Sequence, residues 1–209
     1  MKGLIIKDIR LVLSQRIFLA LVSLASILLA LFSDNPEFAI PYASFLGIIY
    51  GVSTLNMDES SKGLSYLMTL PVTRRGFVKE KYIFTIVFGL IYAGAVTLLC
   101  MVGSVLHGSN AAEVLFIACT VMPWELVLLG ILFPVYIKFG TQNGRLVVAM
   151  AVGLSGVALM GLTPMIYKGG ELPMLNDEAF TVLLMAVLSV IWVYLSYRIS
   201  VGIMERKEF

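Results

Sequence analysis

Residues able to carry out chemistry are few in this sequence and lie far apart. The single histidine, His107, argues against an H-E-x-x-H zinc site and against a serine–histidine pair at membrane depth. Since no G-x-x-x-x-G-K-[ST] phosphate loop occurs, we do not expect the chain to hydrolyse ATP by itself. Cys100 and Cys119 both fall inside apolar runs, where thiols are typically small packing residues. We therefore expect a non-catalytic chain that binds no metal, cofactor or nucleic acid.

One ionisable residue, Glu125, lies deep inside an apolar run, within Pro123-Trp124-Glu125. A carboxylate at bilayer depth costs ~2.5 kcal/mol or more on insertion scales, so we expect it to face protein or water. Two interpretations remain open. Glu125 is either a polar point in a translocation path or broken helix, or an internally hydrogen-bonded or protonated side chain beside a proline kink.

The composition places these residues in a membrane protein. Apolar residues make up 59% of the 209 residues and charged residues 13%, and the mean hydropathy is +0.95. A hydrocarbon core about 30 Å thick needs about 20 apolar residues in a helix. Runs of this kind predict an all-α, polytopic single transmembrane domain over 1–209 with about six spans, at 17–33, 38–55, 82–105, 113–137, 145–167 and 180–203.

The lysines and arginines predict the orientation of these spans. On the six-span layout, 14 of the 15 fall on one side, with Lys168 as the exception. Cytoplasmic loops carry such an excess of basic residues. Both termini, the loop 56–81 and the tail 204–209 are therefore predicted to be cytoplasmic.

The N-terminal segment 1–16 has the pattern of a helix lying on the membrane surface. One arc of a helix over 4–15 is apolar and faces a polar arc, although two leucines break the pattern. The alternative is a basic extension of the first span. The apolar arc holds Ile5, Ile6, Ile9, Val12 and Leu13, the polar arc Lys7, Arg10 and Ser14, and the exceptions are Leu4 and Leu11.

The loop 56–81 is the long polar segment of the chain, and it predicts a short helix. Asp58-Glu59-Ser60-Ser61 is suited to cap a helix over 63–70, which Pro71 would end. Leu64, Leu67 and Met68 would form one apolar face on a segment too short to fold alone. We expect the membrane surface or another protein to cover that face. The basic residues that follow, Arg74, Arg75, Lys79 and Lys81, are expected to meet anionic headgroups.

Small residues recur at helical spacing in the second and third spans. They allow two helices to approach closely, and packing within the chain is the simpler interpretation. The residues are Ala43, Gly47 and Gly51 in the second span, with Gly89 and Ala93 in the third.

Taken in order, a basic amphipathic start, six spans and a cytoplasmic loop after the second span resemble the ABC-2 type permeases. The local resemblance lies in Asp58-Glu59-Ser60-Ser61-Lys62-Gly63, Leu70-Pro71-Val72-Thr73-Arg74-Arg75 and Val78-Lys79-Glu80-Lys81-Tyr82. Small bacterial members of that family carry an acidic start, an LPV(S/T)R core and a KY at the next span.

The resemblance implies a permease subunit of an ATP-driven exporter in the bacterial cytoplasmic membrane. It implies a second permease copy, identical or related, and two copies of a separate ATPase subunit that holds ATP and Mg²⁺. Compact members include exporters of amphipathic or antimicrobial peptides, such as phenol-soluble modulins. The short helix after the second span would couple to the ATPase, through Asp58, Glu59, Leu64, Tyr66, Leu67, Met68, Leu70, Arg74 and Arg75.

A stand-alone membrane protein, such as an immunity factor or a scaffold without an ATPase, is the alternative. A neighbouring gene for a P-loop ATPase would favour the exporter, and its absence would favour the alternative. An intramembrane enzyme has less support, because no nucleophile–base or metal constellation accompanies Glu125.

Overall fold

The computed structural model describes residues 2–32, 36–60, 63–69, 73–106, 111–168 and 178–207, and for 141–168 it describes the course of the backbone alone. Every regular element in these ranges is a helix, as predicted. The elements are α1 (Lys2–Ser14), α2 (Arg16–Phe32), α3 (Pro36–Ser60), α4 (Gly63–Thr69), α5 (Arg74–Leu106), α6 (Ala111–Lys168) and α7 (Glu178–Arg206).

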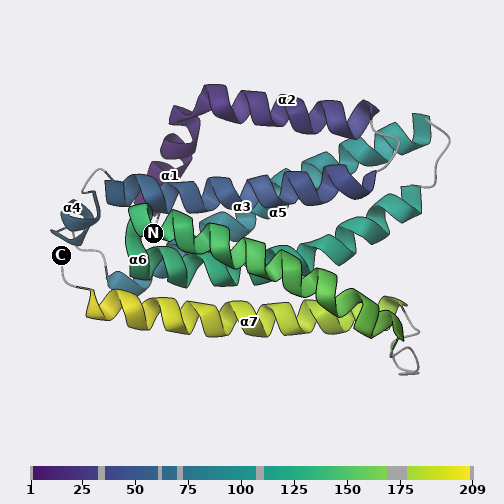
Figure 1. Cartoon of the computed structure of the whole chain (residues 1–209). Helices are drawn as coiled ribbons and strands as arrows, with labels where there is room; N and C mark the ends of the chain where they lie inside the picture. The colour runs from purple at the N-terminus through teal and green to yellow at the C-terminus, as the bar shows by residue number, and fades with distance from the viewer. Residues whose placement is uncertain are drawn as a thin grey trace.

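The long helices form a bundle whose two ends differ (Figure 1). The helices α2, α3, α5, α6 and α7 run along the long axis, whereas α1, α4 and the C-terminus lie at one end. At that end α6 turns back on itself at Gly140, where φ is 73° and ψ is −178°. Only glycine adopts such a conformation easily, so Gly140 fixes the point at which the two arms of α6 separate.

Each apolar run of the sequence forms a helix or one arm of α6, with ends close to those predicted. Among the described residues, three segments are long and apolar enough to cross a membrane: Arg74–Val105, Ala111–Gly140 and Val182–Arg206. Residues Gly3–Ser14 and Leu19–Leu28 give a fourth if this pair, bent by 75°, counts as one span. Six spans remain a prediction, and the side chains of the fifth, 145–167, lie outside the described residues.

Glycines join α3 to α5 at the centre of the bundle. A Cβ built on Gly47 would lie 3.1 Å from the Cα of Gly89, and one built on Gly51 would lie 2.3 Å from the Cγ2 of Thr85. Neither position has room for a larger side chain. The expectation that the small residues serve packing within the chain is confirmed.

Side chains of α7 donate hydrogen bonds to two main-chain oxygens of α6, one of them four residues before Pro134. Pro134 has no N–H, so the main-chain oxygen of Gly130 lacks its usual partner in the helix. Ser196 donates a hydrogen bond to that oxygen, and Trp192 Nε1 donates to the oxygen of Val127 at 3.2 Å. Beside Trp192 an apolar groove of about 620 Å³ opens between α6 and α7.

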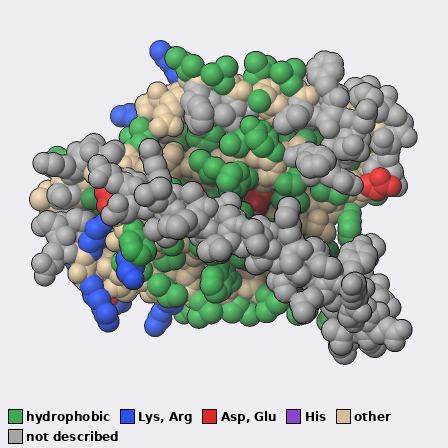
Figure 2. Space-filling model, in the orientation of Figure 1, with side chains coloured by type: hydrophobic (Ala, Val, Ile, Leu, Met, Phe, Trp, Pro, Cys, Tyr) green, Lys and Arg blue, Asp and Glu red, His purple; other side chains and the backbone are tan. Residues whose placement is uncertain are grey.

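Charged side chains are distributed unevenly over the face shown in Figure 2. Lysine and arginine side chains gather at the end that holds α4, and hydrophobic side chains cover the middle of the bundle. Both chain ends lie at this basic end. This arrangement agrees with the uneven distribution of charge predicted from the sequence.

Candidate functional site

The apolar face of α4 is covered by the chain itself. Leu64 and Leu67 are buried, in one hydrophobic cluster with Phe77, Ile137 and Met204. The expectation that the membrane or another protein must cover these two leucines is therefore wrong, because α4 packs against α3 and the leucines join a cluster with side chains of α3, α5, α6 and α7. The side chain of Met68, and Leu70 as a whole, lie outside the described residues.

The surface that α4 presents is made by other residues. Tyr66 is 69% exposed, and Thr69 is exposed as well. A tyrosine offers a large apolar ring and a hydroxyl at one position, a combination enriched at protein interfaces.

Asp58 and Glu59 do not cap α4, in contrast to the prediction. Both lie in the last turn of α3, which ends at Ser60. The C-terminal end of a helix carries a partial negative charge, so two carboxylates in this turn require cations nearby. Lys7 and Lys81 supply them to Asp58, and Lys207 supplies one to Glu59.

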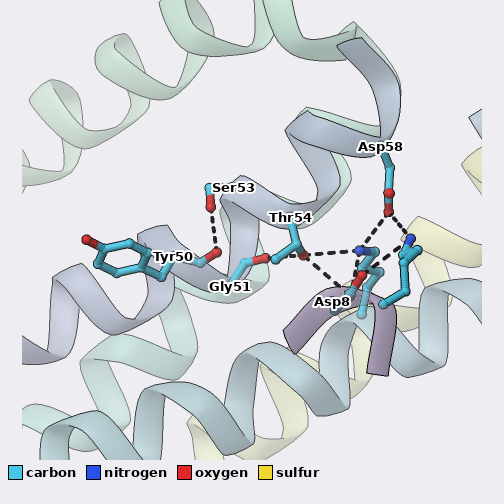
Figure 3. A network of polar contacts seen from close by, with 8 residues as sticks. Asp8, Tyr50, Gly51, Ser53, Thr54 and Asp58 are labelled. Atoms are coloured by element: carbon cyan, nitrogen blue, oxygen red, sulfur yellow. Dashed lines mark hydrogen bonds and ion pairs between the residues drawn. The ribbon is translucent and has the colours of Figure 1, made fainter. Parts of the chain in front are cut away.

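Asp58 and its two lysines form a closed ring with a second carboxylate, Asp8. We call these four side chains the charge ring: Lys7 and Asp8 of α1, Asp58 of α3 and Lys81 of α5. Lys7 Nζ lies 2.6 Å from Asp58 Oδ2 and 3.3 Å from Asp8 Oδ1. Lys81 Nζ lies 2.6 Å from Asp8 Oδ2 and 2.8 Å from Asp58 Oδ2. Figure 3 shows Asp8 and Asp58 converging on these amino groups from two helices.

Three members of the charge ring are buried, whereas the side chain of Lys7 is 27% exposed. The side chain of Asp8 is 0% exposed and that of Lys81 1%, so Lys81 does not meet headgroups as expected from the sequence. Thr54 Oγ1 accepts a hydrogen bond from Lys81 at 3.1 Å. The Phe77 ring lies 5.5 Å from Lys81 Nζ and 5.8 Å from Lys7 Nζ, within the range of cation–π attraction.

The C-terminal segment is tied to the same end of the bundle. Lys207 pairs with Glu59 at 3.0 Å and donates to the main-chain oxygen of Ile137 at 3.2 Å. Arg74 donates to the main-chain oxygens of Met204 and Glu205, at the end of α7.

Thr73 is the N-cap residue of α5, because its hydroxyl accepts the N–H of Gly76 at 3.1 Å.

Arg75, another basic residue of the loop 56–81, forms its ion pair at the surface. Arg75 forms an ion pair with the Glu205 carboxylate at the surface. Exposed pairs of this kind contribute little to stability. Arg74 and Arg75 thus position the start of α5 against the end of α7.

The helix α1 forms as predicted, although a different face is buried. Leu4, Asp8 and Val12 point into the bundle, whereas Ile6, Ile9 and Leu13 are exposed, among others. Leu4, which lies outside the predicted apolar arc, is one of the residues through which α1 packs against the bundle. The exposed apolar residues remain available for the membrane contact that the sequence predicts.

Glu125 lies apart from the α4 end, in the middle of the first arm of α6. Its side chain is 6% exposed and lies beside Ser44 of α3, so it faces protein as expected. The Oε1 atom has no hydrogen-bond partner among the described residues. A role in a translocation path remains a prediction.

Sequence reasoning missed the central member of the charge ring. Asp8 is the one acidic residue before Asp34, and it belongs to neither of the arcs predicted for the N-terminal helix. An isolated acid in a basic amphipathic helix is the signal that pointed to a buried partner.

These features define a multi-pass helical membrane protein whose ion pairs, among the described residues, lie at the end of the bundle that holds α4. A family model described as "ABC-2 family transporter protein" matches residues 3–205. Because the match covers nearly the whole chain, the protein belongs to the ABC-2 transporter family, as its membrane component. Family membership implies an ATPase partner on a separate chain. Searches of curated proteins and of solved structures found no match.

Proposed function

We propose that this chain is the permease subunit of an ABC exporter in a bacterial cytoplasmic membrane, with both termini in the cytoplasm and six spans. Two copies, or one copy and a related permease, would assemble with two ATPase subunits that hold ATP and Mg²⁺. Amphipathic peptides are the proposed substrates. The observation that carries this proposal is α4, which presents Tyr66 outward at the basic end of the bundle.

The burial of Leu64 and Leu67 gives α4 a mechanical role in this proposal. A helix of seven residues is too short to hold its own position. Because its leucines belong to the same cluster as Phe77 of α5 and Met204 of α7, a displacement of α4 would move those helices too. We propose that the ATPase contacts α4 from outside, through Tyr66, and that this cluster transmits the movement.

Glu125 is proposed as a polar point of the translocation path. Its burial beside Ser44 and its unpartnered Oε1 support this role, since a path for amphipathic molecules needs polar groups at depth.

Tyr66→Asp tests the coupling role of α4. The variant should keep its membrane insertion and thermal stability, since Tyr66 is 69% exposed. It should lower ATP-driven peptide export on the order of tenfold or more, as hot-spot residues of interfaces do. Export would be measured in proteoliposomes that contain the permease and an ATPase subunit that co-purifies with it.

Tyr194→Asp provides no matched control, because a charge on the exposed apolar side of α7 would disturb insertion. Tyr66→Ala and Tyr194→Ala form the matched pair, since Tyr194 is 59% exposed. Only the first should reduce export. Full export by Tyr66→Asp would contradict the coupling role of Tyr66, whereas an unmodified chain that shows no ATP-driven export would favour a stand-alone membrane protein.

A further inference from the structure

The charge ring can satisfy its charges in two ways. In the first pairing Lys7 bonds Asp58 and Lys81 bonds Asp8, both at 2.6 Å, and each bond joins α1 to another helix. In the second pairing Lys7 bonds Asp8 within α1, at 3.3 Å here, and Lys81 bonds Asp58 between α5 and α3, at 2.8 Å. All four contacts exist in this structure, with the first pairing the shorter.

We propose that the charge ring is an exchange latch for α1. A shift to the second pairing breaks both ion pairs that hold α1 to the bundle and keeps the one that joins α3 to α5. Each of the four charges retains a partner throughout. A buried charge left alone is strongly unfavourable, so the exchange gives α1 a way to undock that single ion pairs would not allow.

The remaining contacts of α1 suit such a movement. Leu4 and Val12 are its buried apolar side chains, and Thr54 Oγ1 of α3 donates to Asp8 Oδ2 at the long distance of 3.5 Å. Just after α1, Gln15 Nε2 lies 3.4 Å from Met57 Sδ. Ile6 and Leu13 are more than half exposed. The ionic contacts at Lys7 and Asp8 are thus a large part of what holds α1 in place.

Groups around the ring connect it to α4. The ring of Phe77 lies beneath both lysines, and Phe77 shares a hydrophobic cluster with Leu64 and Leu67. Glu80 of α5 is also buried, with its carboxylate beside that of Asp8. A shift of α4 would therefore displace Phe77, and Phe77 would in turn displace the two lysines of the charge ring. This link rests on the proposed function, whereas the latch belongs to the permease chain alone.

Two double variants remove the same charges in number and sign but leave different ion pairs. K7M/D8N leaves Asp58–Lys81, which does not involve α1, and should release α1. K7M/D58N leaves Asp8–Lys81, which joins α1 to α5, and should hold it in place. Both keep the net charge of the protein.

The position of α1 would be measured by thiol labelling of Val12→Cys with a maleimide, in nanodiscs and without ATPase. Cys100 and Cys119 would first be replaced by alanine. We expect labelling of K7M/D8N to be on the order of tenfold faster than that of K7M/D58N. The protein with all four charges of the charge ring should be labelled at an intermediate rate. Labelling of the exposed Leu13→Cys should be equal in all three.

Equal rates at position 12, or the reverse order, would overturn the latch. If either double variant fails to fold, spin labels at Leu13→Cys and Ile83→Cys in the unmodified ring provide the second measurement. Both positions are exposed. Two distance populations are expected, and a single one would overturn the proposal. Neither result depends on the ATPase, so a failure of the latch is distinguishable from a failure of the coupling role of Tyr66.

Discussion

The interface between α3 and α5 and the interface between α6 and α7 are built in different ways. In the first, Gly47 and Gly51 bring the backbones together, and the charge ring joins the two helices beside α4. In the second, Trp192 and Ser196 bond to main-chain oxygens of α6, and an apolar groove of about 620 Å³ remains beside them. Close contact and buried charge suit the α3–α5 pair to move as one body. The groove gives the α6–α7 pair room to adjust.

Of the changes proposed here, removing one charge of the charge ring should lower the stability of the protein most. Lys81→Met leaves Asp8 without its 2.6 Å partner in a fully buried position. Breaking a buried ion pair from one side costs about 3–5 kcal/mol. We expect a large drop in the melting temperature of the purified protein, followed by size-exclusion fluorescence after heating.

Lys79→Met is the control for this prediction, since Lys79 lies on the same helix and is exposed. It should change the melting temperature little. Equal melting temperatures for the two variants would mean that the charge ring does not stabilise the α3–α5 pair.

Adding one methyl group to each interface should lower the melting temperature less than the loss of a charge does, and by different amounts at the two interfaces. A Cβ on Gly51 meets Thr85 at 2.3 Å, and overpacking of this kind costs about 1–3 kcal/mol. A Cβ on Gly130 meets Trp192 Nε1 at 2.5 Å, but Trp192 borders the groove and can move away. We expect Gly51→Ala to lower the melting temperature more than Gly130→Ala does.

Gly94→Ala serves as the matched control, because a Cβ there meets nothing within 4 Å. It should leave stability unchanged or raise it slightly, as alanine favours a helix over glycine by about 1 kcal/mol. A larger loss at Gly130 than at Gly51 would reverse the order of rigidity assigned to the two interfaces.

The helices could be predicted from the sequence because apolar runs of span length leave few alternatives. The end of α3 could not. Asp58 and Glu59 have the local pattern of a helix cap, and the lysines that allow them to end α3 include Lys7, 51 residues away. Local patterns contain no information about such distant partners.

The candidate site was predictable in its location and less so in its contacts. The spacing of Leu64 and Leu67 identified an apolar face of α4, but spacing does not say what covers that face. Here Phe77, Ile137 and Met204 lie in the same cluster, and Tyr66 is left exposed. Asp8 was overlooked because a charged residue in an amphipathic pattern is first assigned to the polar side.

The most direct test of the account is a photo-cross-link from position 66. Benzoylphenylalanine would replace Tyr66 in the full complex of permease and ATPase, and Tyr194 on the exposed side of α7 would be replaced in parallel. The account predicts a cross-link to the ATPase subunit from position 66 and none from position 194. An intact, co-purifying complex that gives no cross-link from position 66 would contradict it.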